Sequence, residues 1–295
     1  MGALSGWVCL VTGASRGIGK GIAVQLGEAG ATVYITGRNS LTLGETAGEV
    51  EARGGACVPV TCDSSKDDEI RSLFERIGRE QKGRLDILVN NAFGGVQTYF
   101  DNLGKTFWEM PPSVWDDMNN VGLRGHYICS VYAARMMVQA GRGLIVIISS
   151  TGGLWYDFNV PYGVGKAACD RLACDGAVEL RGAGVAMVSL WPGAVRTETV
   201  LENVLSRDPG SKAEEEVSVS VCLYKKLMSL SGKVLLTCDL SRRYNLRDLD
   251  GTRKVILHLS RFLVSRVPGL SWLSSFIPSF LRVPKFVLTL RASKF

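Results

Sequence analysis

Short apolar runs alternate with longer amphipathic segments over most of the chain. The apolar runs predict strands at Val8–Thr12, Thr32–Thr36, Cys57–Thr61, Asp86–Val89, Leu144–Ser149, Val185–Leu190 and Lys233–Leu236. Apolar residues at helical spacing predict helices near Ile18–Ala29, Leu41–Arg53, Asp67–Gln81, Val114–Ala140 and Tyr162–Arg181. This alternation is typical of an α/β domain in which a doubly wound parallel sheet is covered by helices on both faces.

Glycines mark where several of the predicted helices end. They stand close to the start of the following strand, where C-caps are expected, at Gly30, Gly54, Gly83, Gly141 and Gly184. A polar stretch at Ser206–Glu216 contains Pro209-Gly210 and predicts a surface loop or lid.

The first predicted strand opens into a glycine-rich loop, Thr12-Gly13-Ala14-Ser15-Arg16-Gly17-Ile18-Gly19, and a predicted helix follows. Glycines suit this spacing because the backbone must turn tightly and let a pyrophosphate approach closely. The helix N-terminus then offers free N–H groups and the positive end of its dipole. Three glycines alone could form an ordinary turn, but their place between an apolar strand and a helix favours dinucleotide binding.

Four further motifs follow the glycine loop in order. Asn90-Asn91-Ala92 and Ser149-Ser150 each end a predicted strand, Tyr162 and Lys166 form Tyr-x-x-x-Lys, and Pro192-Gly193 precedes Thr197. Together with the G-x-x-x-G-x-G spacing, they make about residues 5–240 resemble the short-chain dehydrogenase/reductase family. The resemblance implies a Rossmann-type domain over residues 1–250, a nicotinamide dinucleotide, and hydride exchange with a carbonyl or alcohol.

Basic residues at two positions favour NADP(H) as the cofactor. An acidic residue after the second strand would hold the ribose hydroxyls of NAD, but this chain has Gly37-Arg38 there. Arg16 lies inside the glycine loop, so two guanidinium groups could bind the additional phosphate of NADP. The alternative is that either Arg simply points into solvent. The resemblance further implies that Asp63 contacts the adenine ring, and that Asn90 and Ile18 line the cofactor channel. The full set of predicted cofactor residues is Gly13, Ser15, Arg16, Gly17, Ile18, Gly19, Arg38, Asp63, Asn90, Tyr162, Lys166 and Thr197.

Tyr162 and Lys166 are four residues apart and therefore share one face of a helix. A phenol with a pKa near 10 transfers protons poorly at neutral pH, and a neighbouring ammonium would favour the phenolate. In the family, the Lys also holds the nicotinamide ribose and a Ser hydrogen-bonds the substrate oxygen. We predict Ser150 for that role, with Ser149 as the lesser candidate. Taken alone, Tyr-x-x-x-Lys would indicate no more than a solvated helix face.

The chain departs from the family pattern at two positions near this site. Many members place an Asn seven residues after a Trp, where it holds a water that relays protons to the Lys, but counting from Trp115 gives Gly122. Asn119 and Asn120 would face elsewhere on a helix, so neither is assigned that role. The residue after Asn90-Asn91-Ala92 is Phe93 instead of Gly. The segment after Pro192 also looks short, which suggests a reduced substrate lid.

Charge is unevenly distributed along the 295 residues, whose formal net charge is +6. After Asp250 there are eight Lys or Arg and no acidic residue, which leaves 26 basic against 28 acidic residues before that point. We therefore predict a basic, aromatic-rich C-terminal extension over residues 251–295. Apolar residues at helical spacing in Val255–Val267 suggest peripheral attachment to the cytosolic face of the endoplasmic reticulum, a location that the resemblance also suggests. The alternatives are that the extension packs on its own domain or a partner subunit and that the protein is cytoplasmic.

The remaining composition excludes several classes. Eight Cys without a C-x-x-C pair and only two His disfavour a zinc site, and single thiols in a chain of this length predict reduced cysteines. No apolar run reaches the roughly 20 residues that a spanning helix needs. Nucleic-acid binding has no support beyond the charge of the extension.

The sequence thus predicts an NADPH-dependent carbonyl reductase. The rival hypothesis is a cofactor-binding protein of the same fold with little or no catalysis, motivated by Gly122; a sugar-nucleotide epimerase fits the glycine spacing less well. Aromatic residues near the expected site suggest a bulky, apolar carbonyl such as a steroid or xenobiotic ketone, although they could equally be core: Phe93, Trp155, Tyr156, Phe158 and Trp191. The family commonly pairs through its long helices, so a homo-oligomer is an open expectation.

Overall fold

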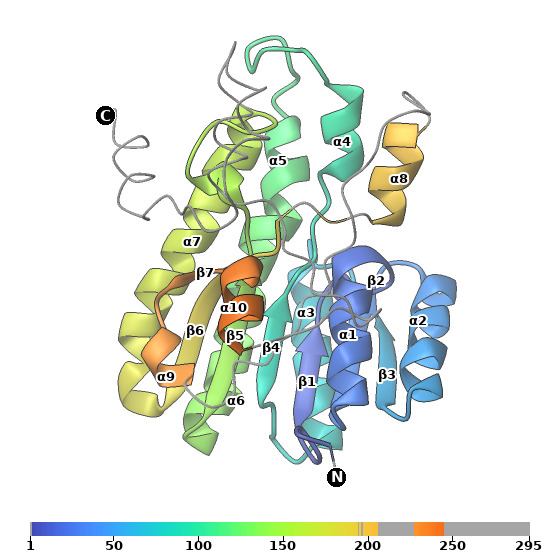
Figure 1. Cartoon of the computed structure of the whole chain (residues 1–295), viewed down its shortest axis with the longest axis vertical. Coiled ribbons are helices and arrows are strands. Elements are labelled where there is room, and N and C mark those ends of the chain that lie inside the picture. The colour runs from blue at the N-terminus through green and yellow to red at the C-terminus, as the bar shows by residue number, and fades with distance from the viewer. Residues whose placement is uncertain (1, 194, 196, 206–226, 245–295) are drawn as a thin grey trace.

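The computed structural model describes residues 2–193, 195, 197–205 and 227–244. Within these residues the chain forms a seven-stranded parallel sheet in the order β3-β2-β1-β4-β5-β6-β7 (Figure 1). The strands are β1 Val8–Val11, β2 Thr32–Gly37, β3 Ala56–Thr61, β4 Ile87–Asn90, β5 Gly143–Ile148, β6 Val185–Trp191 and β7 Val234–Leu236. All the predicted strands are therefore confirmed, and so is the doubly wound α/β fold.

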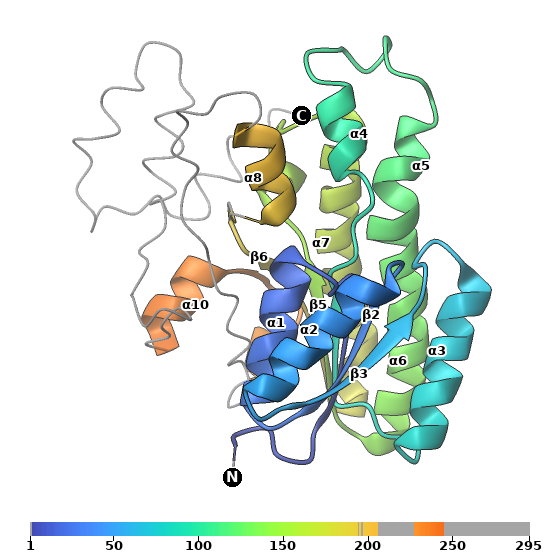
Figure 2. The same ribbon diagram turned by 90° about the vertical axis from the view of Figure 1, so that its right-hand side faces the viewer.

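Helices cover both faces of this sheet (Figure 2). On one face lie α1 Gly17–Glu28, α2 Ser40–Ala52 and α10 Thr237–Tyr244; on the other lie α3 Asp67–Glu80, α6 His126–Ala140 and α7 Val160–Leu180. The short helices α4 Val96–Asp101 and α8 Glu198–Leu205 lie beyond the carboxyl ends of the strands, together with α5 Val114–Asn119. The last short helix, α9 Leu227–Leu230, precedes β7, and single 3₁₀ turns span Thr151–Gly153 and Arg181–Ala183.

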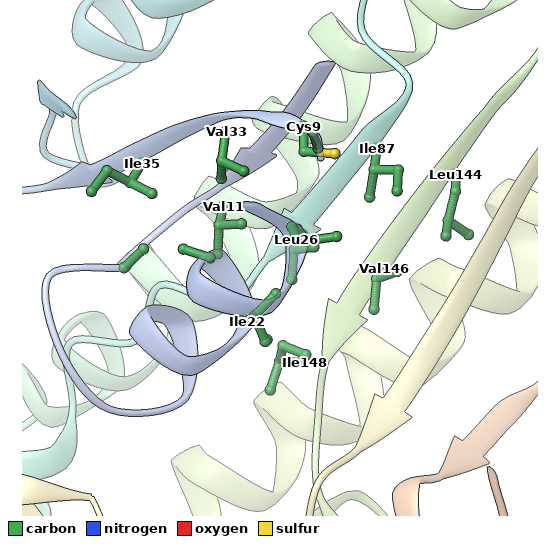
Figure 3. Close-up of a cluster of buried hydrophobic side chains, with 14 of the residues drawn as sticks. Cys9, Val11, Ile22, Leu26, Val33, Ile35, Ile87, Leu144, Val146 and Ile148 are labelled. Atoms are coloured by element: carbon green, nitrogen blue, oxygen red, sulfur yellow. The ribbon is translucent and has the colours of Figure 1, made fainter. Parts of the chain in front are cut away.

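The strands are apolar at successive positions because alternate side chains point into two different hydrophobic cores. Cys9 and Val11 pack with Ile22 and Leu26 of α1 on one face (Figure 3). Val8 and Leu10 point to the opposite face, beneath α3, α6 and α7. A strand with both faces covered needs apolar residues at every position, which is what the sequence shows.

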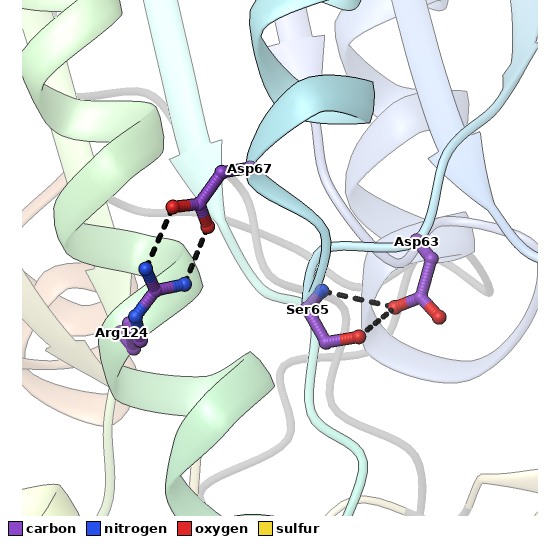
Figure 4. Close-up of polar contacts among 4 residues, drawn as sticks. All are labelled: Asp63, Ser65, Asp67 and Arg124. Carbon is purple, nitrogen blue, oxygen red and sulfur yellow. Dashed lines mark hydrogen bonds and ion pairs between the residues drawn. The ribbon is translucent and has the colours of Figure 1, made fainter.

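The segment predicted as one helix at Val114–Ala140 is interrupted in the structure. Between α5 and α6, Asn120–Gly125 forms a π-helix, in which each carbonyl is shifted by one residue from α-helical pairing. Gly125 allows this segment to approach its neighbour closely, because a Cβ there would lie 2.4 Å from the carbonyl oxygen of Ser64. Arg124 also forms a two-pronged ion pair with Asp67 at the start of α3 (Figure 4).

Several sequence expectations fall on residues outside the described ranges. These are the loop at Ser206–Glu216, the domain boundary at 250 and the extension over residues 251–295. Within the described ranges, no helix is both long enough and apolar enough to cross a bilayer. The same part of the chain contains no group of His, Cys, Asp and Glu side chains that could hold a metal ion.

Candidate active site

The glycine loop between β1 and α1 is packed closely against the end of β4. Gly13 has a φ of 64°, and a Cβ there would lie 2.6 Å from the Cα of Ala92. A Cβ at Gly19 would lie 2.4 Å from the carbonyl oxygen of Gly13 and 2.5 Å from the amide nitrogen of Asn91. Only glycine fits at these positions, so the loop exposes backbone where a side chain would otherwise stand.

Asn91 holds this loop in place. Its side-chain Nδ2 donates to the carbonyl oxygens of Thr12, at 3.0 Å, and Gly13, at 2.9 Å. The Thr12 hydroxyl in turn accepts from the backbone N–H groups of Asn91 and Ala92. Sequence reasoning assigned a role to Asn90 but missed Asn91, although the doubled Asn was the available signal.

Asn90 is fully buried at the end of β4. Its Nδ2 donates to the Ser130 hydroxyl at 2.9 Å, and that hydroxyl donates to the backbone carbonyl of His126. Its Oδ1 has no hydrogen-bond partner among the described residues. This leaves one buried acceptor on the side chain predicted to line the cofactor channel.

The two arginines predicted to select NADP(H) follow the neighbouring strands β1 and β2. Arg16 is the N-cap residue of α1, and Arg38 directly follows β2. Their chain neighbours approach each other, because a Cβ at Gly37 would lie 3.2 Å from the Cβ of Ser15. Both arginines are exposed, so each side chain is accessible to a ligand.

Asp63 follows β3 and is partly buried. Burial alone would raise the pKa of its carboxyl group, but two hydrogen bonds from Ser65 and the charges of Arg38 and Lys66 lower the pKa below its ordinary value. The two bonds come from the backbone N–H of Ser65 at 2.9 Å and its hydroxyl at 2.8 Å (Figure 4). Asp63 therefore carries a negative charge near Arg38 at neutral pH.

Ser150 and Tyr162 meet through their hydroxyl groups. Ser150 follows β5 and caps the 3₁₀ turn, and its Oγ accepts from the backbone N–H of Gly152 at 3.1 Å. Tyr162 lies in the first turn of α7, which Asn159 caps by accepting from the Tyr162 N–H at 2.9 Å. The two hydroxyl oxygens are 2.7 Å apart. A substrate oxygen placed beside them could receive hydrogen bonds from both.

Lys166 lies one helical turn after Tyr162 and is buried. Its ammonium donates to the backbone carbonyl of Ile148 at 3.0 Å. Ser149 points away from the Tyr hydroxyl, because its own hydroxyl donates to the carbonyl oxygen of Lys166 at 3.1 Å. Of the two adjacent serines, the structure thus brings only Ser150 into contact with Tyr162.

Burial sets the protonation of this pair. It raises the pKa of Tyr162 to about 12, against a smaller opposing effect of the hydrogen bond from Ser150, and it lowers the pKa of Lys166. The expectation that the ammonium would lower the phenol pKa is therefore wrong for this structure. The ammonium nitrogen bonds to Ile148 and lies 5.8 Å from the centre of the Tyr162 ring. At neutral pH the phenol is protonated.

The π-helical segment brings no polar side chain to Lys166 at position 122. The Asn119 side chain is buried and donates to the carbonyl oxygens of Trp115 and Pro161, each at 3.2 Å, so it ties α5 to the start of α7. The Gly122 carbonyl accepts from the thiol of Cys169 at 3.2 Å. Asn119 is accordingly engaged in hydrogen bonds within α5 and to the start of α7.

Aromatic side chains surround the Tyr162 ring. Phe158 meets it edge-on, with ring centres 4.8 Å apart, and Tyr99 in turn meets Phe158 at 4.5 Å. Phe158 is 46% exposed and has a φ of 63°, which is rare for a residue with a side chain. Trp191, by contrast, is buried and donates to Asp170 at 3.1 Å, which favours the alternative that it is a core residue. Phe158, with Tyr99 packed against it, presents an accessible apolar surface beside the Tyr162 ring.

Thr197 and Glu198 connect α8 to the glycine loop. A Cβ at Gly17 would lie 3.1 Å from the methyl group of Thr197. The Glu198 carboxylate accepts from the backbone N–H of Gly17 at 2.9 Å. Thr197 was predicted from its motif, whereas Glu198 was not, because a contact over this sequence separation leaves no local pattern.

Known proteins resemble this chain both in sequence and in structure. A model of the family described as short chain dehydrogenase matches residues 7–207. Proteins called dehydrogenase/reductase SDR family member 1 are 57% identical in Mus musculus and 58% identical in Homo sapiens, and each comparison covers 99% of both chains. A solved metagenomic short-chain oxidoreductase in complex with NADP is 36% identical, with a TM-score of 0.60, over 66% of this chain and 84% of that one.

Proposed function

Because the chain belongs to the short-chain dehydrogenase/reductase family of oxidoreductases, we propose that it reduces bulky, apolar carbonyl compounds with NADPH. The observation that carries this proposal is the 2.7 Å contact between the Ser150 and Tyr162 hydroxyls, one helical turn from Lys166. The exposed aromatic surface of Phe158 supports an apolar substrate.

The residues present fit a dinucleotide. Backbone N–H groups at the start of α1 would hold the pyrophosphate, since Gly13 and Gly19 leave no room for side chains there. Arg16 and Arg38, which follow the neighbouring strands β1 and β2, would bind the 2′-phosphate of NADP(H). The solved relative with NADP supports this choice for the present chain.

NADPH, when bound, supplies the hydride to the carbonyl carbon. The Tyr162 hydroxyl holds the proton that the substrate oxygen needs, and its raised pKa keeps that proton in place at neutral pH. Ser150 hydrogen-bonds the same oxygen and stabilises the negative charge that develops on it. Lys166, one helical turn from Tyr162 and with its ammonium held by the carbonyl oxygen of Ile148, would contact the cofactor on the same side of the site.

The experiment that tests the proposal is a panel of ketones and aldehydes, including steroid-like and aromatic compounds, incubated with protein and NADPH while absorbance of the cofactor is followed. We expect turnover with bulky apolar members of the panel. Binding of NADPH without turnover of any compound would instead favour the rival function, a cofactor-binding protein with little catalysis.

Replacing Arg38 with Asp is expected to weaken NADPH binding and to shift preference toward NADH. The new carboxylate would repel the 2′-phosphate and could accept hydrogen bonds from ribose hydroxyls. Dissociation constants for both cofactors, measured by fluorescence, check this, with Arg71→Asp on the exposed part of α3 as the control for charge alone. An unchanged ratio of the two constants would show that Arg38 is merely solvated.

We further propose that the extension over residues 251–295 attaches the protein to the cytosolic face of the endoplasmic reticulum. Its basic and aromatic residues without acidic ones suit an anionic headgroup layer, where each Lys or Arg contributes about 1 kcal/mol. Flotation with anionic liposomes is expected to carry the full chain and not a folded chain ending at Gly251. If both remain in the soluble fraction at low salt, the extension has another role.

A further inference from the structure

Phe93 is the residue that links the two departures from the family pattern. It follows the end of β4, and its ring meets the Tyr162 ring edge-on with centres 5.8 Å apart. The Lys166 nitrogen lies 5.0 Å from the centre of the same ring. We infer that Phe93 is a positioning residue: its ring occupies the space that a side chain at position 122 would need and holds the Lys166 ammonium on its face.

Phe93 and Gly122 are sterically complementary. A Cβ at Gly122 would lie 2.7 Å from Cδ2 of Phe93, closer than real side chains approach. A Cβ at Gly95 would lie 3.0 Å from Cζ of the same ring. The ring therefore requires a glycine at position 122, and a residue with a side chain there would push it away from Lys166.

The Phe93 ring also stabilises the buried positive charge of Lys166. The side chain of Lys166 is almost fully buried, and its ammonium donates to the carbonyl oxygen of Ile148. The electron-rich face of a phenyl ring attracts a cation at this distance, and the attraction is stronger where water is excluded. Phe93 thus favours the charged form of Lys166 without supplying a polar group. Turnover at this site depends on the function proposed above, whereas the contact between the Phe93 ring and the Lys166 ammonium does not.

The first experiment is a double-mutant cycle on Phe93 and Gly122, with kcat and the NADPH dissociation constant as readouts. Gly122→Ala alone is expected to lower kcat by about tenfold, because the added methyl group displaces the ring. In a Phe93→Ala background, Gly122→Ala should change kcat by less than about twofold, since no ring remains to be displaced. Equal effects of Gly122→Ala in both backgrounds would overturn the steric link.

The second experiment separates the ring's charge interaction from its volume. Phe93→Tyr keeps the aromatic face, while Phe93→Leu fills similar space without one. Tyr is expected to retain kcat within about twofold, and Leu to lower the pKa of Lys166 by about one unit. Four other titratable groups influence Lys166 or respond to its charge and are left intact in both variants: His126, Tyr162, Cys169 and Asp170.

The Lys166 pKa can be measured without turnover, from the ¹³Cε resonance of labelled lysine that disappears in Lys166→Met. A lower pKa in Phe93→Leu, with a melting temperature like that of Phe93→Tyr, supports the inference. An unchanged pKa in a folded Leu variant would overturn it, because packing alone would then explain the ring. Absence of turnover by the parent protein would contradict the proposed function and leave this measurement valid.

Discussion

Replacing Tyr162 with Phe is expected to reduce kcat for carbonyl reduction by at least about a hundredfold, the usual scale of lost acid–base catalysis. The phenyl ring would keep its edge contacts with Phe93 and Phe158, so α7 should hold its place. What disappears is the hydroxyl that lies 2.7 Å from Ser150 and carries the transferable proton. Steady-state rates with the best compound of the panel measure the effect.

The matched control is the dissociation constant of NADPH for the same variant, which should change by less than about threefold. Ser150→Ala provides a second comparison, since it removes a hydrogen bond to the substrate oxygen but leaves the proton donor. We expect it to lower kcat by a smaller factor than Tyr162→Phe. A Phe variant that reduces carbonyls at the parental rate would show that another group supplies the proton.

Gly19→Ala is expected to weaken NADPH binding by about tenfold or more and to lower the melting temperature. The added Cβ would lie 2.4 Å from the Gly13 carbonyl and 2.5 Å from the Asn91 amide, so the loop must move. Overpacking typically costs about 1–3 kcal/mol, and about 1.4 kcal/mol corresponds to a tenfold change in affinity. Fluorescence titration and thermal unfolding measure the two effects.

Gly21→Ala, two residues further along α1, is the control for this prediction. Apart from its chain neighbours and the backbone of α1 itself, no atom lies within 4 Å of a Cβ at Gly21, so the same chemical change meets no obstacle. Ala is favoured over Gly inside a helix by up to about 1 kcal/mol, and this variant should therefore be at least as stable as the parent. Similar losses in both variants would show that helix backbone preference, and not the loop, limits cofactor binding.

The strands could be predicted from sequence because both faces of the sheet are covered. Every residue of β1 is buried, and such a run of apolar residues between helical segments has few other interpretations. The helix ends were also readable, since Gly141 and Gly184 have φ values of 67° and 70°, which glycine adopts without strain. Local sequence patterns thus predict the strands and several of the helix ends.

Contacts between distant segments could not be predicted in the same way. The π-helical segment packs through Gly122 against Phe93 and through Gly125 against Ser64. Neither Phe93 nor Ser64 is close to that segment in sequence. The pKa of Tyr162 was misjudged because spacing along a helix shows the nearby charge but not the burial that outweighs it. Asn91 was overlooked because the doubled Asn does not show that the second side chain binds backbone carbonyls of the glycine loop.

The contact between Glu198 and the Gly17 N–H couples two events that would otherwise be independent. One N–H cannot serve a carboxylate and a phosphate at once, so a dinucleotide that uses Gly17 must displace Glu198. Glu198 begins α8, so entry of the dinucleotide and release of the start of this helix would occur together.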